Sequence, residues 1–221
     1  MKLEQAFSGC KTKRGRVWKY DTINKTCSEE EEPFDWSKHY SGEKIQGLSP
    51  VDLETGLVSW LGTDNDINRK PEDFCKTIFS KLGTQYFCYR TMGGNWRIVE
   101  HLEEPIGVDE AKERAKDLEK EVEAIGIKCD KGHTLPQGYD LKNKRPGNWW
   151  VMPYHNEETV CYSPRGHKLT KENTEFRIKY KVHPIVVATV GMIGKGDKKT
   201  EGDGGSRRKA IFCVLLYKKH F

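Results

Sequence analysis

The sequence predicts an α+β protein, with a mostly antiparallel sheet, helices on one face of it and a small helical segment at the C-terminus. Strand-like and helix-like runs mix without the regular strand–helix alternation of a parallel sheet. A Gly-rich turn joins two strand-like runs, and one long amphipathic segment suits a helix that covers a sheet. The length of 221 residues suits one domain with a small appendage, at residues 1–180 and 181–221.

The first predicted regular element is a buried strand at Leu57–Thr63. Residues 1–55 before it contain Gly, Pro and charged residues and predict irregular structure. Within them the acidic run Glu29–Glu32 is typical of a solvated loop. Two aspartates, Asp64 and Asp66, follow the strand directly.

A helix is predicted at Pro71–Leu82, because Pro and acidic residues suit its first turn and Gly83 suits its end. Two strands follow at Gln85–Arg90 and Trp96–Leu102, separated by a turn rich in glycine. Next, apolar residues at spacings of three and four predict a long helix that is capped by Asp109 and ends near Ile125.

Residues 130–148 form a basic connection rich in Gly and Pro. A strand at Trp149–Met152 follows, and Thr159–Tyr162 is its expected hairpin partner. Residues 168–183 give no clear pattern. Two short apolar segments after them predict helices at Ile185–Ile193 and Ala210–Tyr217, with a strand as the alternative for Ile185–Val190.

Charge and cysteine content limit the functional classes. Residues 1–125 have a net charge of −5 and residues 126–221 a net charge of +10, which suggests a polyanionic partner such as nucleic acid, with an ordinary solvated surface as the alternative. Seven cysteines without a Cys-x-x-Cys pair indicate a reducing, cytoplasmic compartment. Cys129 and His133 have zinc-ligand spacing but no second pair nearby. No apolar run reaches the roughly 18 residues of a membrane span, and the N-terminus has no apolar leader.

Asp64 and Asp66 are the main chemical clue. Side chains two apart on a strand point the same way, about 7 Å apart, so both carboxylates face one side at the strand end. Carboxylate oxygens are ligands that Mg²⁺ prefers, and paired carboxylates suit phosphoryl-transfer sites. A turn is the alternative. A calcium loop is excluded, because Arg69 and Cys75 occupy the places of its Gly and Glu.

Several short motifs follow one another in a recognisable order along the chain. They are His39-Tyr40-Ser41-Gly42-Glu43, Gly47-Leu48-Ser49-Pro50, Trp60, Asp64-Asn65-Asp66, Gly147-Asn148-Trp149-Trp150-Val151-Met152-Pro153-Tyr154 and Gly204-Gly205-Ser206-Arg207-Arg208. Their order and spacing resemble the primase–polymerase domain of the archaeo-eukaryotic primase superfamily, in its bacteriophage form. The resemblance implies a core with an RRM-like palm, followed by a small helical appendage.

The resemblance also implies an activity. The expected function is a DNA primase, a nucleotidyltransferase that makes short primers on single-stranded DNA from nucleoside triphosphates during phage replication. Asp64 and Asp66 would hold Mg²⁺ or Mn²⁺. The chain contains no Walker loop. The resemblance implies a separate replicative helicase as a partner, and a location in the host cytoplasm if the protein is phage-encoded. The alternative is a degenerate primase-fold module that binds nucleic acid without synthesis.

Two motifs depart from the family pattern. Trp96 stands where the family has a nucleotide-contacting His, and Arg97 follows it. Arg97 suits phosphate and Trp96 suits base stacking, but strand alternation lets only one of them face the site. The nearest counterpart of the family's third acid is Asp130. The resemblance implies that Asp130 is a catalytic and metal-binding residue. A surface turn is the alternative for Asp130.

Basic residues interleaved with aromatic ones suggest a nucleic-acid groove, because charges follow phosphates and rings stack on bases. Arg145 and Asn148 are expected near the nucleotide or template. The expected nucleic-acid-binding residues are Lys142, Lys144, Trp149, Arg207 and Arg208. Core packing of Trp149 or its neighbour Trp150 is the alternative for the aromatic pair, and a plain surface cluster is the alternative for the two arginines.

Overall fold

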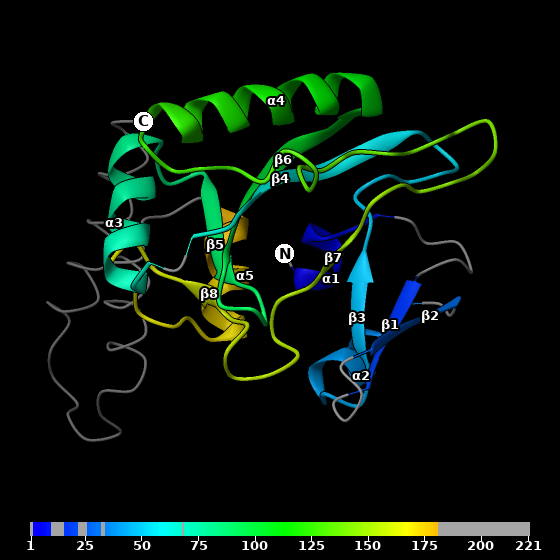
Figure 1. The fold of residues 1–221 in the computed structure, drawn as a ribbon, viewed down its shortest axis with the longest axis horizontal. Helices are drawn as coiled ribbons and strands as arrows, with labels where there is room; N and C mark the ends of the chain where they lie inside the picture. The colour runs from blue at the N-terminus through cyan, green and yellow to red at the C-terminus, as the bar shows by residue number, and fades with distance from the viewer. Residues whose placement is uncertain (1, 10–15, 22–25, 32–33, 68, 181–221) are drawn as a thin grey trace, which may run out of the picture.

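The computed structural model describes residues 2–9, 16–21, 26–31, 34–67 and 69–180, and it is an α+β fold with two antiparallel sheets (Figure 1). The helices are α1 Leu3–Ala6, α2 Trp36–Tyr40, α3 Pro71–Lys81, α4 Val108–Ala124 and α5 Lys171–Tyr180. The strands are β1 Arg16–Asp21, β2 Thr26–Glu31, β3 Ile45–Leu48, β4 Leu57–Asn65, β5 Tyr86–Arg90, β6 Trp96–Gly107, β7 Trp150–Val151 and β8 Cys161–Tyr162. No helix in these ranges is both long and apolar enough to cross a bilayer.

The first sheet has the strand order β2-β1-β3-β7 and lies to the right in Figure 1. It corrects the prediction that residues 1–55 are irregular. Glu29–Glu31 belong to β2 and pair with β1, so the loop expected at this acidic run is wrong. The sequence of β2 lacks alternating apolar residues, and its pairing depends on a neighbouring strand rather than on local pattern.

The second sheet has the order β4-β6-β5-β8, and α3 and α4 pack on one of its faces. The predicted strand at Leu57–Thr63 and the three elements after it are confirmed, although β6 continues to Gly107. The N-cap of α4 is Gly107, so the cap predicted at Asp109 is wrong and Asp109 lies in the first turn.

The opposite face of this sheet packs against α1, α5 and β7. Helices therefore cover both faces, and the prediction of helices on a single face is wrong. The predicted hairpin between β7 and β8 is also wrong, because β7 pairs with β3 and β8 pairs with β5. Trp150 joins the two sheets, and its ring lies 2.9 Å from the point where a Cβ on Gly62 would be.

Residues 171–180, which gave no clear pattern in the sequence, form α5. Its buried Arg177 donates to the carbonyl oxygens of Thr84 and Tyr86, both at 3.2 Å. The guanidinium carbon lies 4.8 Å and 5.0 Å from the ring centres of Phe79 and Phe87. This cation anchors α5 to the sheet through backbone oxygens and aromatic faces.

Residues 181–221 lie outside the described part of the chain. The proposed second domain, both helices predicted within it, Arg207 and Arg208 all fall in that segment.

Candidate functional site

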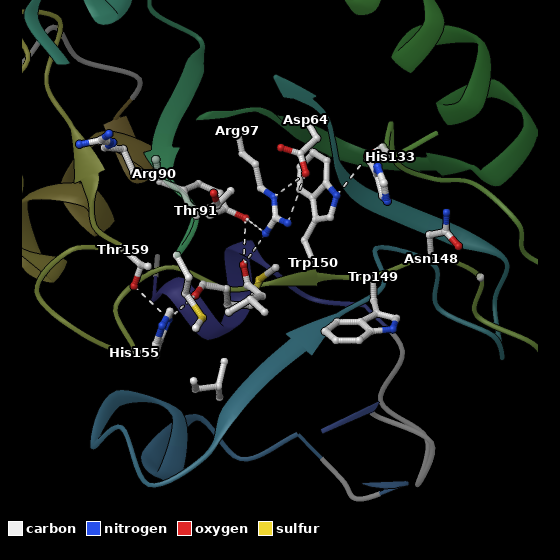
Figure 2. Close-up of a pocket in the computed structure, with 17 residues that line it drawn as sticks. Asp64, Arg90, Thr91, Arg97, His133, Asn148, Trp149, Trp150, His155 and Thr159 are labelled. Atoms are coloured by element: carbon white, nitrogen blue, oxygen red, sulfur yellow. Dashed lines mark hydrogen bonds and ion pairs between the residues drawn. The ribbon is translucent and has the colours of Figure 1, made fainter. Parts of the chain in front are cut away.

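A cavity of about 660 Å³ lies between the two sheets (Figure 2). Its walls come from the start of β3, the end of β4, the turn between β5 and β6, and the segment through β7 to Thr159. The lining residues are Ile45, Asp64, Tyr89, Arg90, Thr91, Met92, Gly93, Arg97, His133, Gly147, Asn148, Trp149, Trp150, Val151, Met152, His155 and Thr159. Its volume falls within the usual range of small-molecule sites, roughly 300–1,000 Å³.

Three side chains form a row across the second sheet, on the face that lines the cavity. Asp64 on β4 is the register partner of Arg97 on β6, which in turn pairs with Tyr89 on β5. Directly opposed residues share a face, so this register brings them together. The Nε and Nη2 atoms of Arg97 both lie 3.4 Å from Asp64 Oδ2. Its Nη1 donates to the Tyr89 hydroxyl at 3.4 Å and to the Val151 carbonyl at 3.0 Å.

Asp64 carries a largely buried carboxylate that lacks a full set of hydrogen-bond partners. Its side chain is 13% exposed, and Oδ1 is buried with no hydrogen-bond partner among the described residues. Burial raises the pKa of the Asp64 carboxyl, while the nearby Arg97 guanidinium opposes that rise. A buried polar atom without a partner costs free energy, so an electropositive ligand at this carboxylate would be stabilised.

Asp66 lies just beyond the end of β4 and is exposed. Its Oδ1 accepts a hydrogen bond from Asn95, and its charge contributes to raising the pKa of Asp64. The two acids predicted as a pair therefore interact electrostatically, but only Asp64 lines the cavity. Within the described residues, however, no three His, Cys, Asp or Glu side chains are grouped as a metal cage.

Asp130 lies beside the end of β4, because its backbone N–H donates to the Asp64 carbonyl at 2.8 Å. Its carboxylate is engaged locally: Oδ1 accepts from the Gly132 N–H at 3.1 Å, and Oδ2 lies 2.6 Å from Nδ1 of His133. The hydrogen bond with His133 lowers the pKa of Asp130. The segment expected to carry the third acid is thus near Asp64, but its carboxylate contacts an imidazole.

Cys129 and His133, the two residues with zinc-ligand spacing, have different partners in the structure. Cys129 is buried, and its thiol donates to Asn65 Oδ1 at 3.3 Å. Burial raises the pKa of Cys129 to about 12, so the group stays a neutral thiol. The side chain of His133 is 60% exposed and contacts Asp130 instead.

Of the two neighbours at the second motif, Arg97 faces the cavity and Trp96 faces the core. Trp96 is fully buried and stacks on Phe74 with ring centres 4.5 Å apart. Its Nε1 donates to the Arg69 carbonyl at 3.1 Å. The expectation that Trp96 stacks on a base therefore conflicts with its position, because no face of the ring is open.

The aromatic pair divides in the way that strand alternation requires. Trp149 is half-buried and lines the cavity, where its ring occupies the space that a side chain on Gly47 would fill. Trp150 is buried, and its Nε1 donates to the His133 carbonyl at 3.1 Å. The Arg97 guanidinium carbon lies 4.8 Å from the Trp150 ring centre. Both rings line the cavity, and Trp149 is the more exposed of the two.

The predicted basic residues are spread more widely. Asn148 lines the cavity and donates to the Gly132 carbonyl at 3.4 Å. Lys142, Lys144 and Arg145 are exposed on a tight turn closed by backbone bonds between Asp140 and Arg145. These three do not line the cavity, so the expected place of Arg145 at the nucleotide is not supported by its position.

Sequence reasoning missed Tyr89, His155 and Thr159 as cavity residues, and it considered His133 only as part of a zinc pair. Thr159 Oγ1 lies 2.9 Å from His155 Nδ1, and burial lowers the pKa of His155. Tyr89 shares the face of Arg97 only because of the β5–β6 register, which no local pattern encodes. For His133, the spacing of three residues from Asp130 was a usable signal.

No protein-family model matches the chain, and a search of curated protein sequences finds no match.

Proposed function

We propose that the protein is a primase–polymerase-type nucleotidyltransferase that binds a nucleoside triphosphate in the cavity between the sheets and extends a primer on single-stranded DNA. The proposal rests on the resemblance of the motifs and on one observation above all. The carboxylate of Asp64, which the resemblance assigns to the metal, lines the cavity between the sheets and has a buried oxygen without a hydrogen-bond partner among the described residues.

The residues present fit a divalent cation that arrives with its nucleotide. Mg²⁺ in triphosphate sites is usually held by one or two carboxylates together with phosphate oxygens and water, so a cage of three protein ligands is not required. Asp64 and Asp66 are the carboxylates offered here. The cation would neutralise phosphate charge at the reacting centre.

The other cavity residues suit the remaining parts of a nucleotide or template. Trp149 is a half-buried ring at the cavity, and stacking of a base on such a ring is worth about 1–3 kcal/mol. The Arg97 guanidinium lies between Asp64 and Trp150 and adds positive charge to the cavity wall. Asn148 offers an amide at the cavity edge.

A second candidate is a module that binds nucleotide or single-stranded DNA without synthesis. The Asp64–Arg97 ion pair favours it, because Arg97 already occupies one carboxylate oxygen. The engagement of Asp130 with His133 favours it as well, because it removes a third carboxylate from the metal site.

Primer synthesis and DNA binding separate the two candidates. The full chain is incubated with single-stranded DNA, labelled nucleoside triphosphates and Mn²⁺, and products are resolved on a gel. Labelled primers from the wild type and none from Asp64→Asn or Asp66→Asn support the transferase. Single-stranded DNA binding without product, equal in all variants, supports the binding module.

Asp117→Asn is the matched control, since Asp117 is an exposed acid on α4 that pairs with Lys120 and does not line the cavity. It should behave as the wild type in both assays. Loss of product in this control would attribute the effect to general charge rather than to the site.

A further inference from the structure

We propose that the first sheet forms the base-binding wall of the cavity, and that Gly47 is the residue that positions its aromatic ring, Trp149. The ligand of this wall is a nucleobase, carried either by single-stranded DNA or by a nucleoside triphosphate. The inference rests on the proposed function for the choice of ligand. It concerns binding alone, however, and can be tested without primer synthesis.

The strand register places a set of apolar residues on the cavity side of the first sheet. Gly47 on β3 pairs with Val151 on β7. Ile45 and Trp149 lie two residues before these partners along the chain, and alternate residues of extended chain point to the same side. Ile45, Trp149 and Val151 all line the cavity. The wall that the first sheet contributes here is therefore apolar, with Gly47 among its residues.

The close approach of the Trp149 ring explains why position 47 is a glycine. A Cβ on Gly47 would overlap Cε3 and Cζ3 of the Trp149 indole and would lie 2.8 Å from the Trp150 carbonyl oxygen. The backbone at Gly47 has no positive φ, so its conformation is open to other residues. The absence of a side chain is thus required by the ring rather than by the strand. Gly47 forms a seat for the edge of the Trp149 ring.

The exposure of Trp149 distinguishes it from the tryptophans of the core. Trp60, Trp96 and Trp150 are at most 1% exposed, and each donates Nε1 to a backbone carbonyl, as packed tryptophans usually do. Trp149 is only half-buried and lies at the cavity. What the seat at Gly47 provides is therefore the place of a ring that a ligand in the cavity can reach.

The opposite wall of the cavity carries charge. Asp64 and Arg97 on the second sheet line it, and in Figure 2 they lie across the cavity from Trp149, which is beside β3. A cavity with one apolar, aromatic wall and one charged wall suits a ligand that has a flat ring at one end and anionic groups at the other. Nucleotides have this form, and aromatic side chains are the usual partners of their bases.

Two pairs of ligands separate base contacts from phosphate contacts. The first pair is a normal and an abasic single strand of equal length, and the second is a nucleoside triphosphate and inorganic tripolyphosphate. We expect Gly47→Ala and Trp149→Ala each to weaken binding of the base-containing ligand roughly 5-fold or more, the lower end of the loss of a stacked base. Binding of the abasic strand and of tripolyphosphate should remain that of the wild type. The pair that responds identifies the source of the base.

A double-mutant cycle tests whether Gly47 acts through Trp149. In the double variant Gly47→Ala/Trp149→Ala the overlap with the indole is gone, so the glycine substitution should add no further loss of base-dependent binding. If Gly47→Ala alone fails to fold, the double variant should fold. Gly107→Ala is the control, because a Cβ on Gly107 would meet nothing within 4 Å and Gly107 does not line the cavity. It should bind all four ligands as the wild type does.

Several results would overturn the inference. Equal losses for the normal and the abasic strand, or for the nucleotide and tripolyphosphate, would show that Gly47→Ala acts on the fold. Additive losses in the double variant, or its failure to fold, would show that the glycine serves the backbone. A Trp149→Ala protein that keeps the wild-type preference for bases, or a wild type without any such preference, would remove the base-binding wall. Base-dependent binding without primer synthesis would instead overturn only the proposed function.

Discussion

Substitutions at Trp96 and Trp149 should separate an effect on stability from an effect on DNA binding, because Trp96 is buried in the core and Trp149 lines the cavity. Replacing Trp96 by Phe keeps an aromatic ring on Phe74 but removes the Nε1 hydrogen bond to the Arg69 carbonyl and part of a fully buried ring. The hydrogen bond contributes about 1 kcal/mol. The residual cavity adds roughly 1–2 kcal/mol, at about 24 cal/mol per Å³.

Urea denaturation measures this loss, because the midpoint shifts in proportion to it. With a slope of about 2 kcal/mol per M, a loss of 2–3 kcal/mol lowers the midpoint by about 1 M and leaves the slope unchanged. The affinity of Trp96→Phe for single-stranded DNA should stay within twofold of the wild type, since a buried ring has no face for a base.

Trp149→Ala should give the reverse pattern. Loss of a stacking partner worth about 1–3 kcal/mol weakens DNA binding roughly 5- to 150-fold. Its stability should fall less than that of Trp96→Phe, because Trp149 is only half-buried. The reasoning is refuted if Trp96→Phe weakens DNA binding more than fivefold while its urea midpoint stays in place.

Three further changes test the packing and two buried basic side chains, His39 and Arg177. Gly62→Ala places a Cβ 2.3 Å from the Ile98 carbonyl oxygen, and overpacking of this kind should cost about 1–3 kcal/mol; an unchanged thermal midpoint contradicts it. Burial lowers the pKa of His39 from 6.5 to about 4, so the unfolded state takes up the proton first. Stability is complete above pH 6.5 and should fall by roughly 3 kcal/mol as the pH drops to 4, and chemical denaturation of His39→Gln should show a flatter pH dependence. Arg177→Met leaves the Thr84 and Tyr86 carbonyls without their donor and should lower the unfolding free energy by about 2–4 kcal/mol, with faster hydrogen exchange in α5; wild-type exchange rates would contradict it.

Elements with strong local periodicity were predictable from sequence. The strand at Leu57–Thr63 and the helix α4 are confirmed, because their apolar residues repeat at the spacing that each structure requires. The pairing of β7 with β3 was not predictable, since strands of two residues have almost no local pattern and their partners lie far away in the chain. The strands β1 and β2 were missed for another reason: they are neighbours along the chain, but β2 lacks the alternating apolar residues that mark a strand.

The site was predictable to the extent that it depends on strand alternation. Strand alternation predicted that only one of Trp96 and Arg97 faces the cavity, and in the structure that residue is Arg97. The Asp64–Arg97 ion pair required the β4–β6 register, which residue types alone do not determine. The contact between Asp130 and His133 depends on a turn whose geometry the composition of residues 130–148 did not reveal.

The cavity has one wall from each sheet, and side-chain hydrogen bonds join those walls. Arg97 and Tyr89 on the second sheet both donate to the Val151 carbonyl on β7, and Trp150 on β7 donates to the His133 carbonyl beside β4. The spacing between Trp149 and Asp64 is consequently a property of how the sheets are inclined to each other, rather than of any single loop. A ligand that draws Arg97 away from Val151 would remove one of these hydrogen bonds, so occupancy of the cavity and the inclination of the sheets are mechanically linked.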